Sequence, residues 1–147
     1  MNTREIEYIL RKNRKTASVF LGAVPSDGIP DASIFPYAVV INTEPHDDRG
    51  RHWVAVFVES KDRVEYFDSY GGLPNSNIAT FLLRFPHLLR HTDSFQSLSS
   101  KVCGHYCIFF LIKRCSRRSF AQIVSTLKAQ RPRTDRYVAN YVMNLVR

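Results

Sequence analysis

Two segments rich in β-branched and aromatic residues, HWVAVFVES (52–60) and RVEYFDSY (63–70), follow each other closely in the sequence. Only Lys61 and Asp62 separate them, and two strand-like segments joined by a short polar turn are typical of a β-hairpin. The pair therefore predicts a β-sheet in the fold.

The rest of the chain shows mainly helical spacing of apolar residues. Ser119 and Gln122 form a capping-box pattern, Thr134 can cap a last helix, and Pro86 should kink or divide the helical pattern around it. Helices are expected at residues 3–12, 75–90, 104–114, 120–129 and 135–146, a further strand at 37–42, a loop at 23–32 and an exposed turn at 44–51.

This succession of helix, strands and helices predicts an α+β fold with a central mixed β-sheet flanked by helices. The 147 residues, 44% of them hydrophobic, suit one domain with a substantial core, taken here as residues 1–147. No charged-then-apolar leader opens the chain, and its longest apolar run, near residues 102–112, is too short to cross a bilayer. We therefore expect no membrane partner. Three unevenly spaced cysteines favour a reducing, intracellular compartment.

The basic charge of the chain is concentrated after Cys103. The formal net charge is +8, and the residues from Cys103 onward, in which Asp135 is the single acid, account for all of it. A field of one sign attracts polyanions, most commonly nucleic acid, although the solvated helix faces of a basic protein would look the same. The candidate DNA contacts are Lys113, Arg114, Arg117, Arg118, Arg131 and Arg133.

Cys103 stands where the polar segment SLSSK gives way to an apolar helical pattern. A thiol at neutral pH is mostly protonated, so a reactive cysteine needs a device that favours the thiolate. The N–H groups and the positive dipole end of a helix N-terminus supply such a device. Gly104 would let a substrate backbone approach closely. A buried structural cysteine is the alternative that this segment leaves open.

His52 opens the first strand of the predicted hairpin, and Asp68 lies at the end of the second. These positions are neighbours across a hairpin ladder, so the two side chains should lie side by side. A carboxylate there would orient the imidazole and stabilise its charged form, as the third member of a catalytic triad does. Each residue alone could be ordinary, His52 as a surface histidine and Asp68 as an acidic turn residue.

Gln96, seven residues before Cys103, carries a side-chain amide. Together with the backbone N–H of Cys103, this amide could stabilise the oxyanion that forms when a nucleophile attacks a carbonyl. Taken alone, Gln96 would be an unremarkable polar residue.

The order of these motifs resembles that of the adenovirus protease family, adenain, and of the related SUMO-specific cysteine proteases. The sequence has HW, then YFDSYGG, then a glutamine seven residues before CG, with Tyr106 and Cys107 following. The similarity runs over roughly residues 18–120 and includes FLG at 20–22 and VINT at 40–43.

The resemblance implies a cysteine endopeptidase whose nucleophile, Cys103, lies at a helix N-terminus. His52 would be the general base, Asp68 its orienter and Gln96 a donor in the oxyanion hole. Trp53 would shape a narrow channel that favours glycine next to the cut bond, with plain core packing as the alternative.

The same resemblance implies viral structural precursor proteins as substrates, and a monomer that acts in the host cell nucleus and the virion. DNA and a peptide would be candidate activators, without a metal or organic cofactor. Adenain's activating peptide is tethered by a disulfide to a cysteine upstream of the glutamine. Because no cysteine lies between Trp53 and Val102, this kind of tethering is not expected here. Asp68 stands where adenain has glutamate and SUMO proteases have aspartate, and the longer C-terminal part of adenain has no counterpart after Val146.

Other interpretations stay open. A protease that removes a ubiquitin-like protein would keep the same triad, whereas a non-catalytic nucleic-acid-binding domain would use Cys103 only structurally. A zinc site is less favoured. On a helix Cys103 and Cys107 would share one face, whereas His105 would point elsewhere. That site would consist of Cys103, His105, Cys107 and Cys115, of which Cys107 is expected in the core and Cys115 at the surface.

Overall fold

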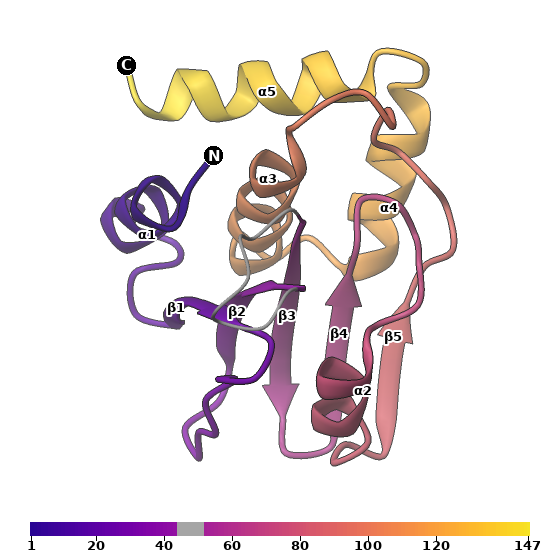
Figure 1. The fold of residues 1–147 in the computed structure, drawn as a ribbon. Coiled ribbons are helices and arrows are strands. Elements are labelled where there is room, and N and C mark those ends of the chain that lie inside the picture. The colour runs from indigo at the N-terminus through magenta and orange to yellow at the C-terminus, as the bar shows by residue number, and fades with distance from the viewer. Residues whose placement is uncertain (44–51) are drawn as a thin grey trace.

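The structure is a computed structural model that describes residues 1–43 and 52–147 (Figure 1). The expected turn at residues 44–51 lies outside the described residues. In chain order the elements are α1 (Thr3–Lys12), β1 (Phe20–Pro25), β2 (Tyr37–Asn42), β3 (Trp53–Ser60), β4 (Arg63–Phe67), α2 (Ser76–Leu82), β5 (His87–Arg90), α3 (Cys103–Cys115), α4 (Phe120–Ala129) and α5 (Thr134–Leu145).

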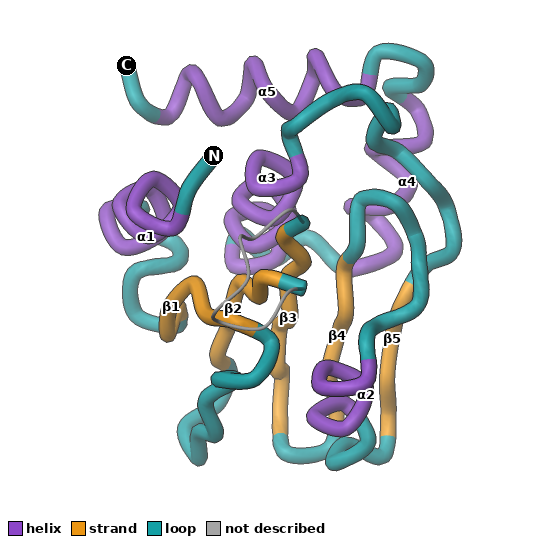
Figure 2. The backbone as a smooth tube through the Cα atoms, viewed as in Figure 1, coloured by secondary structure: helices purple, strands orange, loops and turns teal. Residues whose placement is uncertain are grey.

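The strands form one sheet in the order β1-β2-β3-β4-β5. Strands β2, β3 and β4 are antiparallel neighbours, whereas β1 is parallel to β2 and β5 is parallel to β4, so the sheet is mixed. Figure 2 shows helices on both sides of this sheet. The predicted α+β fold with a central mixed sheet is therefore confirmed, and so is the β3–β4 hairpin that turns at Lys61 and Asp62.

The two faces of the sheet carry separate cores. Alternate residues of β2 show the division: Ala38 and Val40 join the core formed with α1, α3, α4 and α5, whereas Val39 and Ile41 join the core formed with α2. Helix α3 is the central helix of the larger layer, and its residues 106–112 are all buried. It packs against β3, α1, α4 and α5, and α5 crosses the end of α3 at which Cys103 lies (Figure 1).

Two segments differ from the expected elements. The helical pattern at residues 75–90 is divided into α2 and β5, because Pro86 has no N–H to continue a helix and the residues after it pair with the edge of β4. The expected loop at residues 23–32 begins inside strand β1, which pairs with β2 as an edge strand and ends at Pro25. An edge strand tolerates glycine and proline, which hid it in the sequence.

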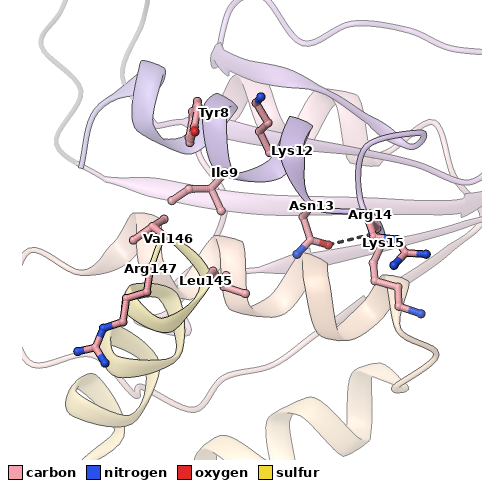
Figure 3. A pocket seen from close by; sticks show the side chains of 9 residues that line it. All are labelled: Tyr8, Ile9, Lys12, Asn13, Arg14, Lys15, Leu145, Val146 and Arg147. Atoms are coloured by element: carbon pink, nitrogen blue, oxygen red, sulfur yellow. Dashed lines mark hydrogen bonds between the residues drawn. The ribbon is translucent and has the colours of Figure 1, made fainter.

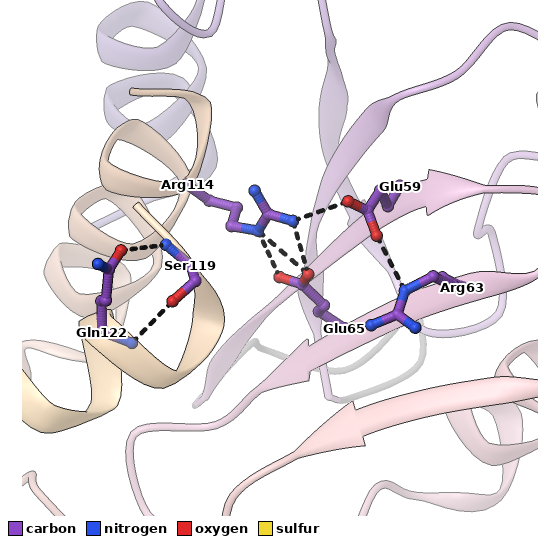
Figure 4. A network of polar contacts seen from close by, with 6 residues as sticks. All are labelled: Glu59, Arg63, Glu65, Arg114, Ser119 and Gln122. Carbon is purple, nitrogen blue, oxygen red and sulfur yellow. Dashed lines mark hydrogen bonds and ion pairs between the residues drawn. The ribbon is translucent and has the colours of Figure 1, made fainter. Parts of the chain in front are cut away.

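The N-termini of α4 and α5 are capped in different ways. The Ser119–Gln122 capping box is confirmed, with both reciprocal hydrogen bonds formed (Figure 4). The prediction that Thr134 caps α5 is wrong, because Arg133 occupies the N-cap position. The Thr134 hydroxyl instead donates to the carbonyl of Leu127 at 3.4 Å, which ties α5 to the end of α4.

Candidate active site

His52 precedes β3 directly and Asp68 follows β4 directly, so the pairing of these two strands brings their side chains together. The Nε2 atom of His52 lies 2.6 Å from the Oδ1 atom of Asp68. The Asp68 carboxylate also accepts the backbone N–H groups of Tyr70 at 2.9 Å and Gly72 at 3.2 Å. The Tyr70 ring packs on the imidazole with the ring centres 4.9 Å apart. Both members of the pair are thus held from several sides.

Cys103 is the first residue of α3 and is only 7% exposed. Its sulfur accepts the backbone N–H of Trp53 at 3.4 Å. The His52 side chain and the Gly104 N–H also act on the sulfur and lower the pKa of the Cys103 thiol. The N-cap residue Val102 forms no side-chain cap, so the positive end of α3 also favours negative charge on the sulfur. The structure therefore brings Cys103, His52 and Asp68 together, with His52 hydrogen-bonded to Asp68 and acting on the pKa of the Cys103 thiol.

The environment of this group shifts its pKa values toward the charged forms. Burial alone would lower the pKa of His52, but the bonds to Asp68 and Cys103 raise that pKa to about 9. Burial would raise the pKa of the Cys103 thiol, yet the bonds from His52 and from backbone N–H groups lower it. Burial likewise works to raise the pKa of Asp68, and the bonds from His52 and backbone N–H groups lower it. The arrangement therefore favours a thiolate, an imidazolium and a carboxylate together.

A cavity of about 410 Å³ adjoins Cys103. Gln96, which is 5% exposed, forms part of its wall. The Gln96 Nε2 donates to the carbonyl of Ser100 at 3.2 Å, and an amide nitrogen has a second hydrogen that can serve an oxygen atom in the cavity. The lining residues are Met1, Trp53, Tyr70, Gln96, Ser100, Lys101 and Cys103.

The two residues predicted to contact substrate lie in different surroundings. Trp53 lines the cavity, and its indole N–H donates to the carbonyl of Met1 at 3.3 Å. Gly104 does not line it: a Cβ there would lie 3.3 Å from Met1 and 3.4 Å from Ile6. The missing side chain of Gly104 allows close packing against Met1 and Ile6, and its contact with substrate stays a prediction.

Arg114 also differs from its expected role as a DNA contact. Its Nε donates to the carboxylate oxygens of Glu65 at 2.9 and 3.1 Å, and a terminal nitrogen donates to Glu59 at 3.3 Å (Figure 4). Glu59 in turn pairs with Arg63 at 3.0 Å. The guanidinium is thus committed to an internal ion-pair network that joins α3 to β3 and β4.

Most of the other predicted DNA contacts are exposed to solvent. Arg117, Arg118 and Arg133 are exposed. Arg131 is exposed too, although it donates to the carbonyl of Ser94 at 3.2 Å. Lys113 is half-buried, with its ammonium 4.8 Å from the centre of the Tyr141 ring. These positions cover the end of α3 and the turn between α4 and α5.

A second basic region was missed in the sequence. It surrounds a cavity of about 460 Å³ between α1 and the end of α5 (Figure 3). The signal was present as RKNRK at residues 11–15, but Arg147, which completes the region, is distant along the chain. The lining residues are Tyr8, Ile9, Lys12, Asn13, Arg14, Lys15, Leu145, Val146 and Arg147.

Within the described residues, no group of three or more His, Cys, Asp or Glu side chains is placed to hold a metal ion. The four residues considered for zinc therefore do not form such a group. Cys107 is buried as expected, and Cys115 is half-buried, where burial raises the pKa of its thiol to about 11. Among the helices of residues 1–43 and 52–147, each is too short or too polar to cross a membrane.

Sequence comparison finds relatives with a named activity. The SUMO-1 cysteine protease S273R of African swine fever virus is 28% identical over 102 residues, which cover 60% of this chain and 37% of that protein. The putative thiol protease R355 of Acanthamoeba polyphaga mimivirus is 28% identical over 133 residues, or 72% of this chain and 44% of the relative. Both of these relatives carry the names of viral cysteine or thiol proteases. No family model matches the chain.

Comparison of structures agrees with this relationship. The crystal structure of the African swine fever virus pS273R protease aligns with a TM-score of 0.63 at 17% identity, over 84% of this chain and 60% of the other, which establishes the shared fold. A selenomethionine crystal structure of the same protease aligns with a TM-score of 0.50 at 26% identity, over 61% of this chain. The chain thus spans less than half the length of the viral cysteine proteases that it matches in sequence.

Proposed function

We propose that the chain is a viral cysteine protease that cuts peptide bonds with Cys103 as nucleophile, His52 as general base and acid, and Asp68 as orienter. One observation carries the proposal: the His52 imidazole, whose Nε2 lies 2.6 Å from the Asp68 carboxylate, acts together with the Cys103 thiol beside a cavity. The relationship to viral proteases with cysteine chemistry supports it.

The reaction follows from these positions. The Cys103 thiolate attacks the peptide carbonyl carbon, and the electron pair of the C=O bond moves to oxygen. The Gln96 amide and the Cys103 backbone N–H donate to this oxyanion. The His52 imidazolium gives its proton to the leaving nitrogen as the C–N bond breaks, which leaves a thioester. Water then attacks the thioester carbon, with neutral His52 accepting its proton. The C–S bond breaks, the acid product leaves, and the Cys103 thiolate and the His52 imidazolium are restored.

The proposed substrates are viral structural precursor proteins cut next to glycine, in the nucleus and the virion. The Trp53 and Tyr70 rings both line the cavity beside Cys103, and two bulky rings there would restrict the room for a side chain at the cut bond. Glycine has no side chain to place there. The resemblance to adenain is a second reason to propose a preference for glycine.

A second candidate function is the removal of a ubiquitin-like modifier from its conjugates. The name of one relative, SUMO-1 cysteine protease, favours it. The same triad would serve both reactions, so the substrates distinguish them.

The test compares internally quenched peptides, with glycine or valine at the scissile position, and a SUMO fusion protein. We expect cleavage of the glycine peptides, weaker cleavage of the valine peptides, and loss of all cleavage in Cys103→Ala. Cleavage of the SUMO fusion alone would favour deconjugation. Activity that survives Cys103→Ala, or no cleavage of any of these substrates, would contradict the proposed protease.

We also propose DNA as a partner of this chain. The exposed arginines Arg117, Arg118 and Arg133 and the net charge of +8 support it. Affinity for duplex DNA should fall steeply as salt rises, and Arg117→Glu combined with Arg118→Glu should weaken it. Affinity that stays constant from low to physiological salt would contradict this partner.

A further inference from the structure

Ser69 lies next to Asp68 in the sequence and is only 1% exposed. Its hydroxyl is 2.6 Å from the Oε1 atom of Gln96. Its carbonyl accepts the backbone N–H groups of Phe95 at 2.8 Å and of Gln96 at 3.2 Å. Ser69 thus holds Gln96 through both its main chain and its side chain, and it joins the turn that carries Asp68 to the loop that carries Gln96.

The side-chain contact determines which end of the Gln96 amide faces which partner. The Gln96 Nε2 donates to the carbonyl of Ser100, and a backbone carbonyl can only accept a hydrogen bond. The Oε1 atom therefore faces Ser69, whose hydroxyl must donate to it. In this orientation the second hydrogen of Nε2 is the one that can reach an oxygen beside Cys103.

Loss of the Ser69 hydroxyl would remove this constraint. Gln96 is 5% exposed, so water has little access to replace the hydroxyl at Oε1. A buried acceptor without a partner is unfavourable, and rotation or displacement of the amide would relieve it. An amide turned the other way would present oxygen instead of N–H to a developing oxyanion and would repel it.

We propose that Ser69 is a positioning residue that fixes the Gln96 amide as an oxyanion donor. The inference rests on the proposed protease function and deepens it. Ser69 acts through Gln96 and does not touch the substrate.

A double-mutant cycle tests the coupling. Ser69→Ala should lower kcat about 10- to 100-fold with little change in KM, because the lost interaction acts in the transition state. The double variant with Gln96→Ala should be no slower than Gln96→Ala alone, since the two residues act as a unit. Full kcat in Ser69→Ala, or losses that multiply in the double variant, would overturn the inference.

A chemical control separates positioning from damage to the fold. Alkylation of Cys103 by iodoacetamide needs the thiolate but forms no oxyanion, so Ser69→Ala should keep the wild-type alkylation rate. A peptide aldehyde, which gives a tetrahedral adduct with oxygen in the oxyanion position, should bind Ser69→Ala more weakly. If alkylation falls as much as kcat, Ser69 only supports the turn at Asp68 and the inference is wrong.

Two further variants complete the comparison. Ser69→Cys has a similar volume and a weaker donor, so its kcat should lie between those of wild type and Ser69→Ala. Ser94→Ala changes an exposed serine of the same loop and should leave kcat unchanged. A wild-type chain without peptidase activity would contradict the proposed function, and with it this inference. An active wild type with a fully active Ser69→Ala variant would contradict the inference alone.

Discussion

The Nε2 atom of His52 lies 2.6 Å from the Oδ1 atom of Asp68, at the end of the β3–β4 hairpin. The carboxylate is fixed by the N–H groups of Tyr70 and Gly72, so it holds the imidazole in one orientation. Because Nε2 faces the carboxylate, Nδ1 is the ring atom left for the sulfur of Cys103. The proposed catalytic group thus depends on the ends of two paired strands and the start of one helix.

Replacing Asp68 by asparagine should lower the pKa of His52. Wild-type activity should be lost as pH rises through about 9, because the imidazolium must donate a proton to the leaving amine. Without the negative charge this loss should begin at lower pH, and kcat should fall by at least about tenfold. The pH dependence of kcat/KM measures the shift of pKa, and kcat measures the loss of rate. Asp62→Asn, in an exposed turn, is the control. If Asp68→Asn loses activity at the same high pH as wild type, Asp68 does not raise the pKa of His52 and the assigned role is contradicted.

Removing the Arg114 guanidinium should destabilise the fold strongly. Its partner Glu65 has a side chain that is 3% exposed, so Arg114→Ala would leave a buried carboxylate without its cation. Breaking a buried pair in this way costs roughly 3–5 kcal/mol. Arg63→Ala removes only an exposed partner of Glu59 and should cost at most about 1 kcal/mol. Urea unfolding measures both, and equal losses would argue against a buried network.

Gly71 should not tolerate a side chain. Its φ is +67°, and a Cβ there would lie 2.4 Å from the carbonyl oxygen of Asp93. Gly71→Ala should cost at least about 2 kcal/mol of stability, and it should lower activity because this turn holds Asp68. Gly28 lies in an exposed loop, where the nearest atom to an added Cβ is a side-chain atom of Pro25 at 3.3 Å. Gly28→Ala should change stability by less than about 1 kcal/mol. Urea unfolding and kcat measure the pair. Wild-type stability in Gly71→Ala would contradict the close packing of the turn.

The sequence indicated those parts of the fold and site that depend on local patterns. The hairpin between β3 and β4 followed from composition and a short turn, and it carried the prediction that His52 lies beside Asp68. The placement of Cys103 at a helix start followed from the change from polar to apolar residues.

Features that depend on distant partners could not be predicted in this way. Strand β5 exists because residues after Pro86 pair with β4, and that pairing is invisible to helical spacing. Arg114 looked like any other surface arginine, since Glu65 lies far from it along the chain. Ser69 was present within YFDSYGG, but its contact with Gln96 appears only when two loops meet.

The reactive state of Cys103 is the central claim, and the pH dependence of its alkylation tests it most directly. Iodoacetamide should label Cys103 in preference to Cys115. The rate of labelling of Cys103 should stay high at pH values at which an ordinary thiol is protonated and reacts slowly. In His52→Ala the rate at pH 6 should fall sharply, because the thiol pKa would return toward its ordinary value. An alkylation rate of Cys103 that is the same in wild type and His52→Ala would contradict the thiolate–imidazolium pair. So would a wild-type rate with the pH dependence of an ordinary thiol.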